Sequence, residues 1–434
     1  MNRTAMTSTL RFLAGAAALA LAACGGGTLS TEEAHLRLVN ATSAAEFPSL
    51  DLFAANGAVV TGVLPDTVSG YGDLKHDTYT LDLRQTGSST ALVTTTATLA
   101  KKDHQSVVAT TSGGTLAMTV LSDQEGAPSS GNAKLRIFNA ASADSGAIDV
   151  YLVAAACTTL ATSAAAATIS NVSGLQTGYT QVTASATPVH LCVTATGDKS
   201  DVRLDIAALT LSDQRIVTVI LTHSTGGVLL HGLVLDQQGA ATAAANSLAR
   251  VRVAASVVPA GPVDVSVNGT VVAAGLTSPA VDPYQLVTAG PLTVQVNGAT
   301  VTPAAPLSAA AGADVTLLVT GTGSTVTGIT DDTSLSSNAA RPVKLRLVNA
   351  LNGAVGTATL TVDNALVGNG AAFGTASAYA TVPASAGLAR VEARSGAIQY
   401  FLANNVTLAS GHVYSLFLLG DVAGPNSGQL VADR

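Results

Sequence analysis

The sequence predicts an all-β protein made of four tandem immunoglobulin-like antiparallel β-sandwich domains. Three observations lead to this fold class. A short apolar strand recurs four times, and its copies begin 99, 116 and 94 positions apart. Each interval holds about seven short apolar segments with turn residues between them, and no amphipathic helix of convincing length. A repeat of this size is too long for a solenoid turn and suits one β-sandwich per copy.

Length and composition support several small cores. The chain has 434 residues, whereas a single hydrophobic core stops growing near about 250–300 residues. Only 11% of residues are charged and the mean hydropathy is +0.42. After the N-terminus, however, no apolar run approaches the roughly 18–20 residues of a membrane helix. The apolar residues therefore belong to many short strands.

The N-terminus has the layout of a secretory signal. Residues 1–23 contain Arg3 and Arg11, then the apolar run 12–21, then small residues. The run ends in Leu21-Ala22-Ala23-Cys24-Gly25, which resembles the bacterial lipobox. That resemblance implies cleavage before Cys24 and acylation of the cysteine, because several acyl chains give a durable anchor. An ordinary soluble secretory signal with an incidental cysteine is the alternative.

The predicted leader also sets the expected location and charge. Gly25 after the cysteine favours the outer membrane by the same resemblance, with the protein facing the periplasm or the cell surface. Residues 24–33 form a short tether. The formal net charge is −7 and becomes about −9 without Arg3 and Arg11. Such a chain is a poor partner for nucleic acid.

The four copies define the predicted domains, which are 34–131, 132–246, 247–340 and 341–434. Each opens on the recurring strand, seen as Leu36-Arg37-Leu38-Val39-Asn40-Ala41 in the first copy and Leu345-Arg346-Leu347-Val348-Asn349-Ala350 in the fourth. The joints at 125–132, 237–246 and 331–341 are polar and small. They are typical of short linkers, so we expect an extended, segmented rod.

A second strand and a tight turn follow the opening strand. Asn56-Gly57 in copy one and Asn268-Gly269 in copy three are the strongest short hairpin signal, because both residue types tolerate positive φ. Asp363-Asn364 takes the same place in copy four. Copy two replaces the turn with a longer loop around Cys157.

A tyrosine precedes an alternating strand in every copy. Alternation with period two indicates one buried and one solvated face. We expect these tyrosines to be core or corner residues. A stacking platform for a ligand is the alternative, although the chain has no tryptophan and only 3% aromatic residues. The four residues are Tyr71, Tyr179, Tyr284 and Tyr379.

An arginine recurs at the second position of the opening strand, and an aspartate recurs on the next strand. We interpret them as a cross-strand ion pair on the solvated face, worth about 0.2–1 kcal/mol. A repeated ion or ligand site is the alternative, but Thr359 replaces the aspartate in copy four. The residues are Arg37, Arg136, Arg252, Arg346, Asp51, Asp149 and Asp264.

Cys157 and Cys192 both fall in copy two, in the oxidising compartment that the leader implies. A disulfide is therefore the default expectation, and free-thiol chemistry is the alternative. The seven histidines show no recognised zinc spacing, although His223 and His231 face each other across a possible hairpin. Asp331-Asp332 is interpreted as polar linker rather than as part of a calcium loop. We expect no metal and no cofactor.

The order of these elements resembles the domain-of-unknown-function family 4397, in tandem copies. The resemblance rests on the opening strand, the hairpin, the central tyrosine and the approach to a late strand. Copy four shows the last element best, at 408–415, whereas 101–104 and 309–314 depart from it. The resemblance implies a β-sandwich in a cell-envelope setting and brings no catalytic residues.

The predicted function is non-enzymatic. G-x-S-x-G, P-loop and dinucleotide-binding glycine patterns are absent from the sequence. We expect a lipid-anchored envelope protein that displays β-sandwich modules to an envelope protein or polysaccharide. The alternative is a module that binds polysaccharide or peptide through loops at the domain ends. A hydrolase is disfavoured, because no acid, base and nucleophile constellation is evident.

Overall fold

The computed structural model describes residues 33–43, 46–112, 114–224, 226–303, 305–335 and 340–434. The described chain is nearly all β, with 62% of residues in strands and 3% in helices. The all-β class is therefore confirmed. The predicted leader at 1–23, Cys24 and nearly all of the tether lie outside the described residues.

We refer to 34–131, 132–246, 247–340 and 341–434 as units 1 to 4. Unit 1 has one sheet ordered β4-β1-β8-β9, in which β5 also pairs with β1, and a second sheet ordered β3-β2-β6-β7. Its strands are β1 (Glu33–Asn40), β2 (Leu50–Ala54), β3 (Gly57–Val63), β4 (Thr67–Val68), β5 (Gly72–Lys75), β6 (Asp77–Gln85), β7 (Ala91–Leu99), β8 (His104–Ser112) and β9 (Thr115–Ser122).

Unit 2 repeats this plan with sheets β13-β10-β16-β17-β18 and β12-β11-β14-β15. Its elements are β10 (Asn132–Asn139), α1 (Ser142–Ser145), β11 (Ile148–Val153), the 3-10 helix η1 (Cys157–Thr162), β12 (Ile169–Val172), β13 (Thr180–Thr183), β14 (Ser185–Ala195), β15 (Asp198–Leu211), β16 (Ile216–His223), β17 (Leu230–Asp236) and β18 (Ala241–Ala244).

Units 3 and 4 also each have two main sheets. Those of unit 3 are β22-β19-β28-β29 and β21-β20-β25-β26, with β23 on β19 and a small sheet β24-β27. Its strands are β19 (Leu248–Val257), β20 (Pro262–Val267), β21 (Thr270–Thr277), β22 (Ala280–Val281), β23 (Gln285–Thr288), β24 (Gly290–Pro291), β25 (Val294–Val296), β26 (Ala299–Thr300), β27 (Ser308–Ala309), β28 (Asp314–Gly321) and β29 (Thr325–Asp331).

Unit 4 has sheets β33-β30-β37-β38 and β32-β31-β35-β36, with β34 on β30. Its strands are β30 (Val343–Asn349), β31 (Ala358–Val362), β32 (Ala365–Ala371), β33 (Thr375–Ala376), β34 (Ala380–Val382), β35 (Ser385–Ser395), β36 (Ile398–Leu408), β37 (Val413–Gly420) and β38 (Asn426–Ala432).

One pairing in each unit departs from the predicted antiparallel pattern. The opening strand runs parallel to the first strand of a late hairpin: β1 with β8, β10 with β16, β19 with β28, and β30 with β37. The intervening strands cross to the other sheet and return, so the two strands can run in the same direction. Hairpin signals report only neighbours in sequence and could not predict this pairing.

The tight turns follow the sequence, with one shift. Val267 pairs with Thr270 around Asn268 and Gly269, and both turn residues have positive φ. Asp363 and Asn364 form the equivalent turn in unit 4. In unit 1, however, Ala54 pairs with Gly57, so Ala55 and Asn56 are the central residues rather than Asn56 and Gly57.

Each unit has a hydrophobic core that both of its main sheets supply. In unit 1, Leu36 and Leu38 of β1 belong to the same buried cluster as Leu50 and Leu52 of β2. Corresponding clusters fill units 2, 3 and 4. The outer face of the opening strands is buried as well, because it packs against a neighbouring unit.

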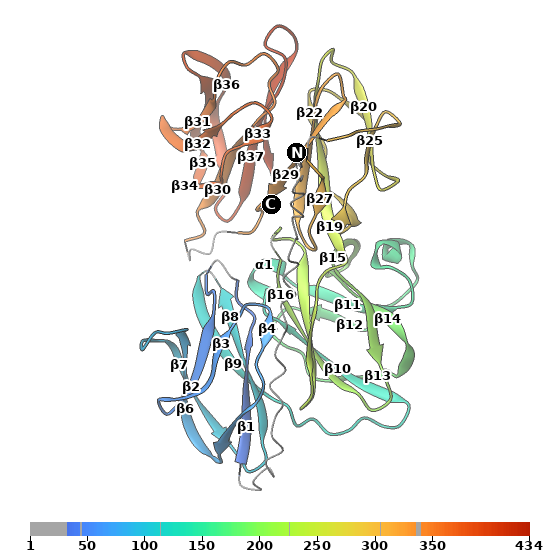
Figure 1. Ribbon diagram of the computed structural model, residues 1–434, viewed down its shortest axis with the longest axis vertical. Helices are drawn as coiled ribbons and strands as arrows, with labels where there is room; N and C mark the ends of the chain where they lie inside the picture. Colours follow the sequence, from blue (N-terminus) through green and yellow to red (C-terminus); the bar gives the residue numbers. More distant parts are fainter. Residues whose placement is uncertain (1–32, 44–45, 113, 225, 304, 336–339) are drawn as a thin grey trace, which may run out of the picture.

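This packing contradicts the predicted extended rod. Units 1 and 2 lie side by side, as do units 3 and 4, and the two pairs are stacked (Figure 1). Val39 and Leu121 of unit 1 share a buried cluster with Phe138 and Ile220 of unit 2. A second cluster joins units 3 and 4. Val39, Phe138 and Val348 on the outward face of the opening strands are apolar and buried, so the sandwiches bury this face against each other.

Contacts between the pairs complete a compact arrangement. Ser224 Oγ of unit 2 donates a hydrogen bond of 2.9 Å to the carbonyl of Gly312 in unit 3. Asp144, in the short helix α1, accepts from Arg341 at 3.2 Å. Arg434 of unit 4 also donates to the carbonyl of Asp144 at 2.7 Å. Within the described residues, the helices are too short or too polar to cross a bilayer.

Cys157 and Cys192 form the expected disulfide, which joins η1 to β14. Both cysteines are fully buried, in a cluster with Tyr151 and Leu160. The bond fastens to β14 the long loop that replaces the tight turn of the other units. It therefore tethers the part of unit 2 that lacks a compact hairpin.

Replacing both cysteines with alanine is expected to destabilise unit 2 by about 3–4 kcal/mol, since the freed loop gains entropy in the unfolded state. Native-state hydrogen exchange of the amides of β11 and β14 measures this loss, with β30 and β37 of unit 4 as the internal reference. Unchanged protection of β11 and β14 in the double variant would contradict the prediction.

Candidate functional site

The four repeated arginines lie at the interfaces between units, on buried rather than solvated faces. Arg37 and Arg346 are each 2% exposed. Their partners are not the aspartates of the next strand, so the predicted cross-strand pair is wrong. The opening strand and the strand that carries Asp51, Asp149 or Asp264 belong to different sheets of the sandwich, which places the two groups apart.

Each arginine belongs to a cluster that recurs in all four units. The guanidinium lies over the ring of the tyrosine of the same unit, at 4.6 Å for Arg37 and Tyr71 and 4.4 Å for Arg346 and Tyr379. Its Nε donates to a hydroxyl on the parallel strand, as from Arg37 to Ser106 at 2.7 Å. The corresponding acceptors are Thr218, Thr316 and Ser415. The tyrosines are therefore interface residues that anchor the arginines.

An aspartate just after or at the end of the last strand completes three of these clusters. Asp331 accepts hydrogen bonds from Tyr284 and Thr316, both at 2.6 Å. In unit 4, Asp433 accepts from Tyr379 at 2.8 Å and from Ser415 at 2.6 Å. Asp331 is buried at the end of β29, so the linker interpretation of this residue is wrong.

The interface between units 3 and 4 exchanges charges reciprocally. Arg252 of unit 3 donates to Asp433 of unit 4 at 2.6 Å. Arg346 of unit 4 in turn pairs with Asp331 of unit 3. Two guanidinium groups thus meet two carboxylates, each across the interface, and all four side chains are nearly inaccessible to solvent. Both charges of each pair are compensated, as burial requires.

Burial sets the protonation of the tyrosines. It raises the pKa of Tyr284, and the adjacent carboxylate of Asp331 raises it further. The same two causes raise the pKa of Tyr379 beside Asp433 and of Tyr71 beside Asp123. These phenols therefore remain neutral and act as hydrogen-bond donors to the carboxylates.

The aspartates of the second strand, Asp51, Asp149 and Asp264, do not pair with the arginines. Each accepts a hydrogen bond from the backbone of an irregular position in the neighbouring strand. Asp51 accepts from the amide of Gly62, and Asp264 from the amide of Gly275, both at 2.7 Å. In unit 2, Asp149 accepts from Asn171 at 2.8 Å. All three donor residues have positive φ, at shifts in the register of the neighbouring strand pair. The aspartates therefore hold β-bulges in place.

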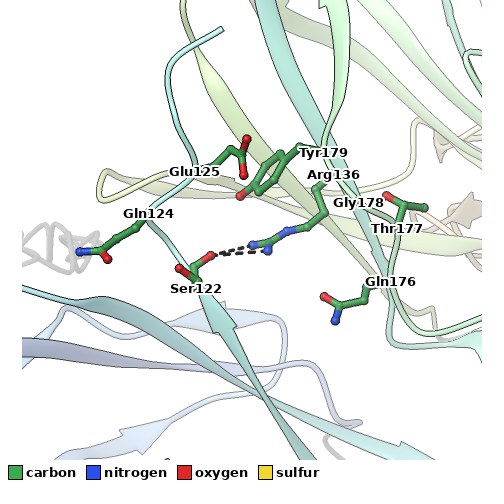
Figure 2. A pocket seen from close by; sticks show the side chains of 8 residues that line it. All are labelled: Ser122, Gln124, Glu125, Arg136, Gln176, Thr177, Gly178 and Tyr179. Atoms are coloured by element: carbon green, nitrogen blue, oxygen red, sulfur yellow. Dashed lines mark hydrogen bonds between the residues drawn. The ribbon is translucent and has the colours of Figure 1, made fainter. Parts of the chain in front are cut away.

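A cavity of about 470 Å³ lies where units 1 and 2 meet (Figure 2). The guanidinium of Arg136 and the ring of Tyr179 border it from unit 2, and Glu125 borders it from the joint. The remaining lining residues are Ser122, Gln124, Gln176, Thr177 and Gly178. Most of these groups are polar, so the cavity is suited to a hydrogen-bonding ligand.

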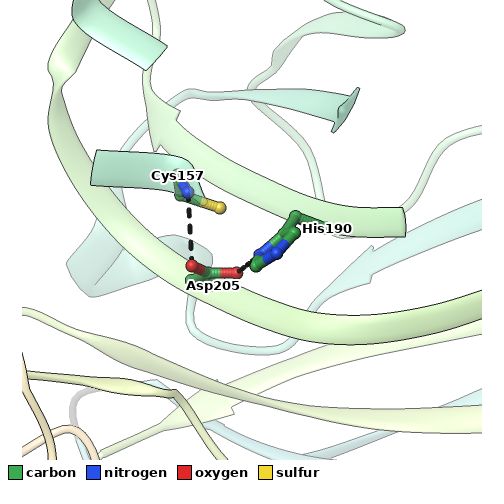
Figure 3. A group of neighbouring side chains, drawn as sticks. All are labelled: Cys157, His190 and Asp205. Atoms are coloured by element: carbon green, nitrogen blue, oxygen red, sulfur yellow. Dashed lines mark hydrogen bonds and ion pairs between the residues drawn. The ribbon is translucent and has the colours of Figure 1, made fainter. Parts of the chain in front are cut away.

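His190 and Asp205 form a second polar group beside Cys157 (Figure 3). His190 Nδ1 lies 2.7 Å from Asp205 Oδ1, and Asp205 Oδ2 accepts from the Cys157 amide at 3.2 Å. Ligand atoms of Cys157, His190 and Asp205 all lie within 4.8 Å of one another. However, the cysteine sulfur is bonded to Cys192 and is no thiolate ligand. We therefore assign these residues to the support of the disulfide loop.

The sequence interpretation missed the aspartates at the ends of the last strands. In unit 1, Leu121 of the last strand pairs with Ser106, whose hydroxyl bonds to the arginine, and Asp123 follows two positions later. Asp331 and Asp433 have the same place in units 3 and 4. Aligning the four last strands by this register would have revealed them. It would also have revealed Gln237 in the same place in unit 2.

Asp331 and Asp332 provide a matched pair of substitutions. Asp331→Asn should lower the stability of the interface between units 3 and 4 by about 3–5 kcal/mol, because it leaves Arg346 buried without its carboxylate. Asp332 is more than half exposed in its pair with Lys344, so Asp332→Asn should change stability by less than about 1 kcal/mol. Hydrogen exchange of β29 and β30 measures both, and equal losses would refute the assignment.

Of three comparisons with known proteins, the one with family models identifies the family of this chain. The family model "Domain of unknown function (DUF4397)" matches residues 34–151 and 249–355, together more than half of the chain. Each match continues through the opening strand of the following unit. The comparison with curated proteins finds no match.

Among solved structures, the chain is similar to the Bacillus anthracis TIE protein at 8% sequence identity and a TM-score of 0.14. The similarity covers 68% of this chain and 51% of that one, so the match spans about half the length of the solved relative. The two long family matches decide the assignment: this chain belongs to the DUF4397 family and carries the domain in tandem copies.

Proposed function

We propose that the protein is a lipid-anchored component of the bacterial cell envelope with a non-enzymatic, structural role. The observation that supports this proposal is that the repeated arginines form ion pairs with carboxylates across the interface between units. Arg252, Arg346 and their carboxylate partners hold two sandwiches together. The most distinctive residues of the repeat therefore serve architecture, and the outward surfaces of the units are left to contact other envelope macromolecules.

The leader and Cys24 supply the anchor in this proposal. Acyl chains on Cys24 would hold the N-terminus at the outer membrane, on its periplasmic or outer side. Residues 24–33, fully extended, reach roughly 33–36 Å. This tether lets the compact block of four units stand away from the lipid surface while it stays attached.

Replacing residues 1–24 with an ordinary secretory signal, which is cleaved without lipidation, is expected to release the protein from the membrane. Without acyl chains the remaining chain, with its net negative charge, has little affinity for anionic lipid. Fractionation of cells into soluble and membrane material should move the variant to the soluble fraction, and mass spectrometry should find acyl groups on the parent chain only. Ser30→Ala, in the same tether, is the control and should stay in the membrane. An unlipidated parent chain, or a variant that remains bound, would overturn the anchoring proposal.

The interaction role is tested separately with the soluble chain that carries the ordinary secretory signal. Chemical crosslinking of this chain in isolated envelope material is expected to give reproducible adducts that map to exposed outer strands, such as β7 and β36. The absence of adducts above those of an unrelated envelope protein would count against a display function.

A further inference from the structure

The two interfaces between paired units differ in their charge balance. At the second interface, Arg252 and Arg346 meet two carboxylates. At the first interface, Arg37 and Arg136 share Asp123, at 3.2 and 4.0 Å. This interface lacks the second carboxylate, because Gln237 of unit 2 occupies the position that Asp433 occupies in unit 4.

The Gln237 side chain is used elsewhere and does not reach an arginine. Its amide accepts from the backbone N–H of Glu125 and donates to the carbonyl of the same residue, both at 2.8 Å. Arg37 therefore donates hydrogen bonds to the backbone carbonyls of Gly239 and Asp236 in unit 2. It also draws on Asp123 of its own unit, whose Oδ2 already accepts from Tyr71 and Ser106.

Of the four arginines, Arg136 lies farthest from a carboxylate, at 4.0 Å from Asp123. Nε donates to Thr218 at 3.0 Å. The two terminal nitrogens reach only the carbonyl of Ser122, both at 3.5 Å, besides Asp123 at 4.0 Å. The equivalent Arg346 instead has a close carboxylate partner. A buried guanidinium with long contacts has hydrogen-bonding capacity to spare.

The Arg136 guanidinium, which has this spare hydrogen-bonding capacity, borders the cavity between units 1 and 2. Arg136 lines the cavity, and its hydrogen bonds to Ser122 run between the other lining residues (Figure 2). The volume of about 470 Å³ falls within the roughly 300–1,000 Å³ of small-molecule sites. Gln124, Gln176 and Thr177 supply amide and hydroxyl groups on the walls.

We propose that this cavity binds a hydroxylated monocarboxylate, of the kind represented by a uronic acid. The ligand carboxylate pairs with the terminal nitrogens of Arg136, which present a planar fork for two oxygens. Its hydroxyls bond to the glutamine amides and to Thr177. The ligand carboxylate thus supplies the negative charge that Gln237 does not. The site lies between units 1 and 2 and not on domain-end loops.

The charges around the cavity favour a single negative charge on the ligand. Glu125 also lines the cavity, and Lys134 pairs with its carboxylate. One guanidinium beside this neutral pair compensates one carboxylate, whereas a phosphate dianion brings an extra charge toward Glu125. The inference does not depend on lipid anchoring, and the test uses the purified chain in solution.

Isothermal titration calorimetry tests the ligand class directly. D-galacturonate is expected to bind saturably with a dissociation constant in the millimolar range or tighter, and neutral D-galactose at least tenfold more weakly. Trigalacturonate separates the two sources of this chemistry: tighter binding of the trimer indicates a polysaccharide, and binding of the monomer only indicates a free sugar acid. Failure of both acids to bind, or equal binding of D-galactose or inorganic phosphate, would overturn the proposal.

Two substitutions, Gln237→Asp and Arg136→Gln, test whether the ligand binds in this cavity. Gln237→Asp restores the missing carboxylate and should weaken D-galacturonate binding at least tenfold, because Arg37 then releases Asp123 to Arg136. Gln285→Asp makes the same charge change at an exposed position of unit 3 and should leave binding unchanged. Arg136→Gln should also abolish binding, with hydrogen exchange of β10 and β16 as the check on folding. Parent-like affinity in a folded Gln237→Asp chain would refute the site.

Discussion

The structure depends on buried arginines that cross from one β-sandwich to the next. Burying a guanidinium costs several kcal/mol unless it is paired and hydrogen-bonded. For Arg252, the Tyr284 ring, the Thr316 hydroxyl and the Asp433 carboxylate meet most of that requirement, while its second terminal nitrogen lies 3.7 Å from Asp331 without a hydrogen bond. Because the carboxylate for Arg252 comes from unit 4, unit 3 cannot satisfy this arginine by itself. The exchange therefore specifies which sandwich faces which, in addition to the nonspecific attraction between apolar faces.

The same constraint explains a composition that is unusual for a modular rod. An opening strand in a freestanding sandwich would turn one face to water and carry polar residues there. In this chain Val39, Phe138 and Val348 occupy that face and are fully buried. The high apolar fraction and the low charge are thus consequences of burying the sandwiches against each other. Units 1 and 2, and likewise units 3 and 4, therefore lie side by side.

Local features of the fold were predictable from the sequence, and the contacts between units were not. Strand positions and the turns at Asn268 and Asp363 follow from side-chain alternation and from residues that accept positive φ. The disulfide follows from two cysteines in one copy. By contrast, the partner of Arg346 lies in another unit, and hydropathy cannot separate a strand with two buried faces from one with a single buried face. The rod and the arginine–aspartate strand pair were wrong for this reason.

Repetition makes a single departure from the pattern informative. Units 3 and 4 show what the interface requires when every charge is matched, since Asp331 and Asp433 each serve the arginine of the other unit. Units 1 and 2 keep both arginines, both tyrosines and the hydroxyls but have Gln237 in place of one aspartate. A buried positive charge that its own fold does not fully compensate destabilises the interface unless something else supplies an anion. The polar cavity beside Arg136 is where such an anion has room, so the interface that is least balanced is the one in which architecture and ligand recognition meet.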